Sequence, residues 1–205
     1  MRAVSIGDRS EFLRDSASGF RVSRVSNYNL QKLNVLVVEG HQMMRRVMRD
    51  VLTSLGVNNV EVVTMNELDA PENAQFQPDV IFTDWSPNCD GLEVIKQIRE
   101  KKRAFDRYIP IVMVSAFTEL KQVCMARDAG ITEFLAKPVS ATLIYRRIAA
   151  MVENPRDFVE TGSFFGPDRR RRQAPPKGTE RRKQVFQYIG GGNREPRAVP
   201  AEPDK

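Results

Sequence analysis

The sequence predicts an α/β fold: a (βα)5 doubly wound parallel sheet, with basic extensions of no regular structure at both ends. Two observations predict it. Short apolar runs rich in β-branched residues alternate with longer segments of helical periodicity between residues 33 and 154. Such runs are typical of strands buried on both faces, and their strict alternation with helices favours a parallel sheet that is covered on both sides.

Each element has its own pattern. The apolar runs predict strands at 33–39, 60–64, 79–84, 109–116 and 132–138. The periodic segments predict helices at 43–56, 66–76, 91–103, 118–130 and 140–154. Ser140 is a favourable N-cap for the last helix, and Gly56 and Gly130 are typical helix stops. Pro71 lies inside the second predicted helix, which we therefore expect to be short or kinked.

The two ends of the chain carry its positive charge. Residues 1–33 hold a net charge of +3, residues 34–154 hold −2 and residues 155–205 hold +5, within a total of +6. We expect residues 1–32 to be a flexible arm, 33–154 to be the folded domain and 155–205 to be a disordered arginine-rich tail. A basic tail indicates an anionic partner.

The composition excludes several classes of protein. No apolar run reaches the length needed to span a membrane. Cys89 and Cys124 form neither a disulfide framework nor a zinc-binding spacing. These features predict a cytoplasmic protein without a membrane partner.

Four polar residues follow the predicted strands, and the carboxyl ends of parallel strands meet at one edge of a sheet. They are Glu39, Asp84, Ser115 and Lys137. A carboxylate at the end of a buried strand is costly unless it has a cation or a chemical task. This combination suits an acyl-phosphate site, in which Asp84 attacks a phosphoryl group, the lysine and the hydroxyl hold its oxygens, and carboxylates hold Mg²⁺.

Several segments of residues 33–154 together resemble the receiver domain of bacterial response regulators, specifically the single-domain CheY-like chemotaxis type. They read "VLVVEGHQMMRRVMRDVLTSLGVNNVEV", "DVIFTDW", "DGLEVIKQIR", "IPIVMVSA" and "EFLAKPV". The resemblance implies a flavodoxin-like fold and phosphorelay signalling by protein–protein interaction, without enzyme activity of its own. It implies a histidine kinase or phosphotransfer protein as partner. It also implies that Asp84 is the phosphoacceptor, Ser115 and Phe134 the switch residues and Lys137 the phosphate-binding residue.

The implied metal site departs from the family pattern in two places. Receivers usually end the first strand with two acidic residues, whereas Gly40 follows Glu39 here. The stretch "DWSPNCDG" is one residue shorter than the usual loop after the third strand. The resemblance therefore implies a degenerate Mg²⁺ site of Glu39, Asp84 and the carbonyl of Ser86. In the alternative interpretation, Lys137 only pairs with Asp84 and holds an inert site together.

The tail contains a repeat, Gly-x-acid-Arg-Arg, at 166–170 and again at 178–182. Arginine binds phosphate oxygens and the O6/N7 edge of guanine in a bidentate manner. The segment resembles the arginine-rich tail of CheY-like cyclic di-GMP effectors that act on flagellar motors. This resemblance implies nucleotide-binding residues at Asp168, Arg169, Arg170, Arg171, Arg172, Arg181 and Arg182.

Three functions stay open from the sequence. The first is a response regulator phosphorylated at Asp84. The second is a phosphorylation-independent cyclic di-GMP effector that acts on a partner such as a flagellar motor switch protein. The third is a receiver with a nucleic-acid-binding tail, which is the less favoured because no helix-turn-helix or RNA-binding fold is visible.

Overall fold

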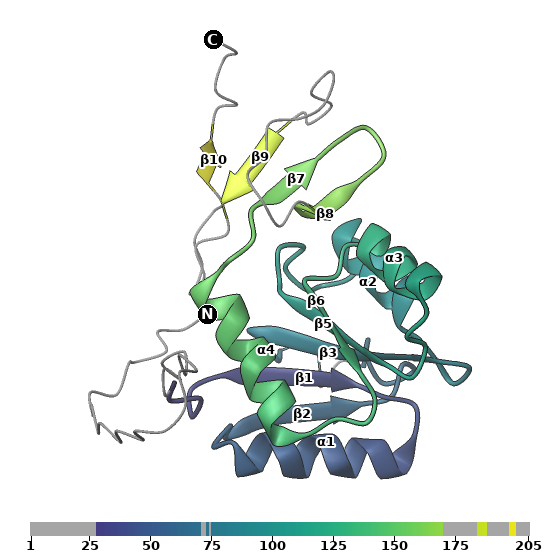
Figure 1. Ribbon diagram of the computed structural model, residues 1–205, viewed down its shortest axis with the longest axis vertical. Helices are drawn as coiled ribbons and strands as arrows, with labels where there is room; N and C mark the ends of the chain where they lie inside the picture. The colour runs from purple at the N-terminus through teal and green to yellow at the C-terminus, as the bar shows by residue number, and fades with distance from the viewer. Residues whose placement is uncertain (1–27, 71–72, 74, 170–183, 188–196, 200–205) are drawn as a thin grey trace, which may run out of the picture.

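The computed structural model describes residues 28–70, 73, 75–169, 184–187 and 197–199. Its main sheet confirms the predicted parallel architecture, with strand order β2-β1-β3-β5-β6 (Figure 1). The order reverses after β1, so the loops following β1 and β3 meet at the carboxyl edge. The parallel strands are β1 (Asn34–Val38), β2 (Asn59–Val63), β3 (Val80–Ser86), β5 (Ile111–Ser115) and β6 (Glu133–Ala136).

Helices cover both faces of this sheet (Figure 1). The side chains of Val35 and Val37 pack with α1 (Gln42–Ser54) and α4 (Ala141–Glu153), whereas Leu36 and Val38 pack with α2 (Gly91–Arg99) and α3 (Leu120–Ala129). The alternation follows from the two-residue period of a strand, which sends successive side chains to opposite faces. Two apolar cores therefore fix each strand end in place. No helix among the described residues is long and apolar enough to cross a membrane.

The predicted helix over 66–76 is wrong in the described residues of that segment. Residues 65–69 form turns between β2 and β3. The Glu67 carboxylate accepts hydrogen bonds from the backbone N–H and the hydroxyl of Thr64, and the Glu67 carbonyl accepts from Ala70 N–H. Pro71 has no N–H to continue a helix, so local side-chain bonds hold turns instead.

The folded domain begins before the predicted boundary at residue 33. The backbone N–H of Tyr28 donates to the Tyr145 hydroxyl at 2.8 Å, and the Tyr28 hydroxyl donates to Glu153 at 3.0 Å. Leu30 is buried in the core on the α1/α4 face. The last residues of the predicted arm are thus part of the domain, and residues 1–27 lie outside the described part.

Four short strands follow α4, where the sequence predicted no regular structure. They form an antiparallel sheet of order β10-β9-β7-β8. Both β8 and β9 pair with β7, one on each side. The strands are β7 (Phe158–Glu160), β8 (Phe165–Pro167), β9 (Gln184–Gln187) and β10 (Arg197–Val199).

Arginine–aromatic contacts join the β7–β8 hairpin to the main domain. Phe158 is buried, and its ring lies 5.3 Å from the Tyr108 ring and 5.7 Å from the Phe165 ring. The Arg99 guanidinium lies 5.2 Å from the centre of the Phe158 ring. The Arg107 guanidinium lies 3.2 Å from the centre of the Phe165 ring. Cation–π contacts and apolar burial together explain why this segment is ordered.

Arg99 also bonds to the domain's own backbone. Its guanidinium donates to the carbonyls of Gly130, Arg107 and Ile109 at 2.7–2.9 Å. These groups lie at or near the amino ends of β5 and β6. The hairpin is therefore attached at the opposite edge of the sheet from Asp84.

Candidate functional site

The structure brings Glu39, Asp84 and Lys137 together at the carboxyl edge of the main sheet. The Lys137 ammonium nitrogen lies 2.7 Å from Asp84 Oδ1 and 2.9 Å from Glu39 Oε2. Both carboxylate side chains are almost fully buried, at 2% and 3% exposure. The two carboxylates thus share one cation, Lys137, which reduces the free-energy cost of burying both negative charges.

The pKa of Lys137 reflects this shared position. Burial by itself lowers that pKa, but the hydrogen bonds to Asp84 and Glu39 outweigh burial and raise it above the ordinary value of 10.5. Lys137 is therefore an ammonium group at neutral pH. Asp84 Oδ2 is buried and has no hydrogen-bond partner among the described residues.

Ser115 lies at the same edge, fully buried at the end of β5. Its hydroxyl donates to the Trp85 carbonyl at 2.8 Å and accepts from the Phe117 N–H at 3.0 Å. The rings of Trp85 and Phe117 meet edge to face, with centroids 5.7 Å apart. Phe134, in β6, is half-buried against the core on the α2/α3 face.

The shortened loop after β3 forms a tight hairpin. β4 (Cys89–Asp90) pairs antiparallel with the end of β3, so Ser86 lies opposite Cys89 and only two residues form the turn. The hairpin turns back onto the β1–α1 loop. A β-carbon on Gly40 would lie 2.7 Å from the Asn88 carbonyl oxygen and 3.1 Å from two further Asn88 atoms. A side chain at residue 40 would therefore require the loop to move.

Two residues of the site were missed by the sequence analysis. Arg45, in α1, donates to the carbonyls of Glu39 at 3.1 Å and Gly40 at 2.9 Å, and so holds the loop after β1. Cys89 is buried beside the acids. Burial, with the nearby charges of Asp84 and Glu39, raises the pKa of its thiol to about 12. An arginine is unfavourable near the positive end of the helix dipole, and this unusual position was the available signal for its role.

The residues at this edge do not fit Mg²⁺ well. Mg²⁺ requires a near-octahedral set of oxygen ligands. Glu39 and Asp84 supply carboxylates, but the Lys137 ammonium bonds to both, and Gly40 supplies no acid. Within the described residues, no group of three or more His, Cys, Asp or Glu side chains is arranged to hold a metal ion.

The structure describes two of the predicted tail residues, Asp168 and Arg169, and Arg169 lies beside α3 at the other edge of the sheet. The Asp168 N–H donates to the Asp157 carbonyl at 2.7 Å. The Arg169 guanidinium lies 3.2 Å from Asp128 and 4.0 Å from the centre of the Phe164 ring. The other predicted tail residues lie outside the described part: Arg170, Arg171, Arg172, Arg181 and Arg182.

Comparison with known proteins decides the family. The family model for the response regulator receiver domain matches residues 35–149, more than half of the chain. The chain belongs to the response regulator receiver domain family. Receiver proteins act in two-component signalling, as the residues at the strand ends imply.

Receiver relatives match nearly over their whole lengths. Chemotaxis protein CheY-3 of Vibrio cholerae is 25% identical over 124 residues, which are 60% of this chain and 94% of that protein. Chemotaxis protein CheY of Pseudomonas aeruginosa is 25% identical over 122 residues, which are 59% of this chain and 97% of that protein. The signal receiver domain of the putative response regulator NarL from Mycobacterium tuberculosis has a TM-score of 0.50 at 24% identity. The match covers 60% of this chain and 98% of that domain, and it supports the receiver fold.

Proposed function

We propose that this receiver acts in two-component signalling through contacts with other proteins, with Asp84 as its phosphoacceptor and a Mg²⁺ site too incomplete for efficient phosphorylation. The close approach of Asn88 to Gly40 is the observation that carries the proposal. The loop backbone lies where the family's second acid would begin. A phosphoryl donor must therefore react without the usual metal ligand.

The two oxygens of Asp84 have different roles in this proposal. Lys137 holds Oδ1, whereas Oδ2 has no hydrogen-bond partner among the described residues. Oδ2 attacks the phosphorus of a phosphohistidine, so that a P–O bond forms and the P–N bond of the donor breaks. The Lys137 ammonium offsets the negative charge of the phosphoryl oxygens.

Acetyl phosphate and a phosphotransfer protein test this function, with intact mass as the readout. We expect a small yield of a single phosphoryl adduct that is absent from Asp84→Asn and changes little when Mg²⁺ is added. Full conversion that depends on Mg²⁺ would contradict the degenerate metal site. No adduct from either donor would contradict the phosphoacceptor role of Asp84.

An exposed apolar surface supplies the proposed partner contact. Leu120 is 79% exposed and Met125 is 44% exposed on α3, and Leu143 is 38% exposed on α4. Exposed apolar side chains indicate a protein-binding surface; α3 leads into β6, the edge strand of the main sheet, and α4 follows it. We assign contacts with a kinase, a phosphotransfer protein or a flagellar motor switch protein to this α3–β6–α4 face.

The arrangement of the tail favours cyclic di-GMP binding as a second candidate function. The first Gly-x-acid-Arg-Arg repeat overlaps the end of β8, and the second ends at Arg182, just before β9. Both strands pair with β7, so in the sequence each repeat is next to a strand of the same small sheet. Two arginine pairs suit a ligand with two guanines and two phosphates.

Calorimetry with cyclic di-GMP tests this second function. We expect binding by the full chain and its loss when Arg169, Arg170, Arg181 and Arg182 are replaced by Ala. The matched control replaces Arg46 and Arg146, two exposed helix arginines, and should keep the wild-type affinity. Equal binding of any DNA, with steep salt dependence and no preference for the dinucleotide, would instead favour a nucleic-acid-binding tail.

A further inference from the structure

The first arginine repeat is held against the receiver body at its glycine. A β-carbon on Gly166 would lie 2.8 Å from the ring of Phe164 and 3.0 Å from the α-carbon of Gly130, so a side chain there would displace one of them. Gly130 itself ends α3 with a φ of 102°, a conformation that L side chains rarely adopt. The Asp168 N–H donates to the Asp157 carbonyl at 2.7 Å. The backbone of the repeat is therefore fixed beside the end of α3 as far as residue 168.

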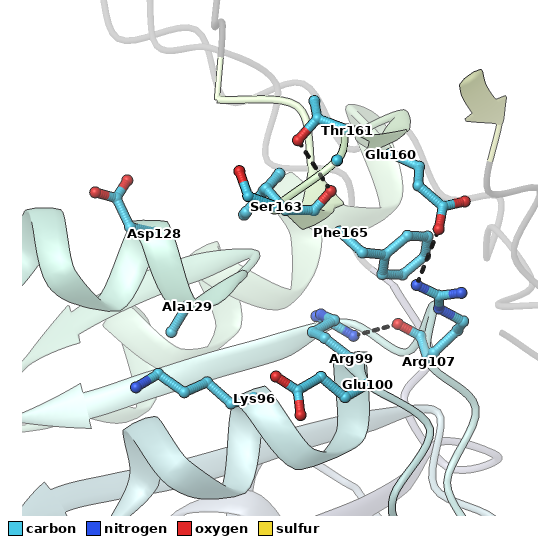
Figure 2. Close-up of a pocket in the computed structure, with 12 residues that line it drawn as sticks. Lys96, Arg99, Glu100, Arg107, Asp128, Ala129, Glu160, Thr161, Ser163 and Phe165 are labelled. Carbon is cyan, nitrogen blue, oxygen red and sulfur yellow. Dashed lines mark hydrogen bonds and ion pairs between the residues drawn. The ribbon is translucent and has the colours of Figure 1, made fainter. Parts of the chain in front are cut away.

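An ion pair continues this attachment at the next residue. The Arg169 guanidinium lies 3.2 Å from Asp128, which is on α3. Asp128 lines a pocket of about 410 Å³ between the receiver body and the hairpin, and Figure 2 shows it across this pocket from Ser163 of the hairpin turn. The side chains of Asp128 and Arg169 are 48% and 39% exposed. A dissolved ligand can therefore reach the ion pair.

Arg169 is engaged on two sides in this structure. Its Nη1 atom lies 3.2 Å from Asp128 Oδ1, and its guanidinium carbon lies 4.0 Å from the centre of the Phe164 ring. An arginine binds a phosphate or a guanine edge through paired N–H groups of the guanidinium. The Asp128 carboxylate faces this group, and its negative charge also repels a phosphate beside it. An anionic ligand must therefore compete with Asp128 for Arg169.

Asp128 keeps a cation when Arg169 leaves. Arg127, the preceding residue of α3, donates from Nε to the same oxygen of Asp128 at 3.0 Å, and its Nη2 atom also lies 3.0 Å from that oxygen. Exposed ion pairs contribute little to stability. Moving Arg169 from Asp128 to a ligand thus leaves no buried or unpaired charge, and the two arrangements of Arg169 differ little in free energy.

We propose that Asp128 is an autoinhibitory contact for the arginine-rich tail: it holds Arg169 on α3, and binding of a guanine dinucleotide transfers Arg169 from the carboxylate to the ligand. The proposal rests on the tail's cyclic di-GMP binding proposed above and adds how the receiver body restrains it. Ligand binding then removes the ion pair between the tail and α3. The coupling is reciprocal, so a protein that supplies a cation to Asp128 releases Arg169 and strengthens nucleotide binding.

Calorimetry of the full chain with cyclic di-GMP tests the restraint. We expect Asp128→Asn to bind about two- to fivefold more tightly than the wild-type chain, in keeping with the strength of exposed ion pairs. In the Arg169→Ala background the same change should have no effect, because the pair is already absent. Glu100→Gln is the matched control. It removes one negative charge from the wall of the same pocket, where Glu100 pairs with Lys102, and should leave the affinity unchanged.

The NMR signal of the Arg169 Nε–H group is a second readout, which does not depend on affinity. It should shift in Asp128→Asn and when cyclic di-GMP binds the wild-type chain. An unshifted signal in the ligand-bound chain would overturn the proposal and leave the tail function standing.

Three results of the calorimetry would do the same. They are unchanged or weaker binding by Asp128→Asn, equal tightening by Glu100→Gln, and equal tightening by Asp128→Asn without Arg169. If the wild-type chain does not bind cyclic di-GMP, the tail function fails and the autoinhibition fails with it. Thermal unfolding of each variant shows whether a change in binding comes from loss of the fold.

Discussion

The carbonyl oxygen of Asn88 lies 2.7 Å from the position that a β-carbon on Gly40 would occupy. The shortened β3–β4 hairpin thus occupies the space that an acidic side chain at residue 40 would need. A shorter loop brings the backbone close to the β1–α1 loop, and only glycine leaves room for that approach.

Replacing Gly40 by Asp should therefore destabilise the protein without creating a metal site. We expect a loss of about 1–3 kcal/mol in the free energy of unfolding, because the new side chain forces the Asn88 backbone to move. Urea denaturation measures it. The control is Gly162→Asp, where an added β-carbon has no atom within 4 Å.

Metal binding by the Gly40→Asp variant can be followed by the fluorescence of Trp85, the one tryptophan of the chain. We expect no saturable response to Mg²⁺ unless one residue is also inserted between Ser86 and Cys89. A saturable response in the single variant would show that the loop moves freely. That result would contradict the steric explanation.

Replacing Lys137 by Met should cost about 3–5 kcal/mol of stability at neutral pH, because the buried carboxylates of Asp84 and Glu39 lose their shared cation. Urea denaturation at neutral pH measures the loss. A variant as stable as the wild-type chain at neutral pH would show that the pair contributes nothing.

Stability at alkaline pH gives an independent test of the ion pairs of Lys137 with Asp84 and Glu39. The pKa of Lys137 is raised in the folded state above its ordinary value of 10.5. The stabilisation is therefore complete below pH 10.5 and is lost as pH rises through the raised pKa. The free energy of unfolding of the wild-type chain should fall more steeply there than that of Lys137→Met, since other lysines and tyrosines titrate in both.

Replacing Phe158 by Ala should detach the β7–β8 hairpin and destabilise the domain by about 3–5 kcal/mol, the usual cost for a buried phenylalanine. Thermal unfolding and limited proteolysis after residue 154 measure the two effects. Phe117→Ala is the control, because Phe117 is 41% exposed. Equal protease resistance of Phe158→Ala and wild type would show that the hairpin is held by other contacts.

The two cysteines should differ in reactivity. Cys89 is buried and its pKa is raised to about 12, whereas Cys124 is half-buried. At about pH 8 we expect one thiol per folded chain to react with an alkylating reagent and both to react in urea, since the thiolate is the reactive form. Peptide mapping identifies the site. Rapid labelling of Cys89 in the folded chain would contradict its buried position.

The strands and most helices could be predicted because their apolar patterns are local. Asp84, Glu39 and Lys137 also meet as expected, since parallel strands bring their carboxyl ends to one edge. The predicted helix over 66–76 was wrong because Pro71 and the Thr64–Glu67 bonds favour turns. The close approach of Asn88 to Gly40 depends on the path of a two-residue turn, which the sequence pattern does not define.

The β7–β8 hairpin was missed for a different reason. The stretch "DFVETGSFFGP" does contain two short apolar runs separated by a glycine-containing turn, which is a hairpin pattern. Its partners Arg99 and Tyr108 lie about 50 residues earlier, and Arg99 falls inside the helix predicted over 91–103. Contacts so distant in sequence leave no periodic trace, so charge and glycine content suggested a tail instead.

Helix α4 connects the carboxyl edge of the sheet, where Lys137 lies, to the amino edge, where the β7–β8 hairpin is attached. It begins after the Lys137–Pro138 segment, with Ser140 as its N-cap, and ends just before the chain reaches Phe158. Its 13 residues span about 20 Å as one rod. The helix is thus a single rigid connection between the Lys137 end of the sheet and the β7–β8 hairpin.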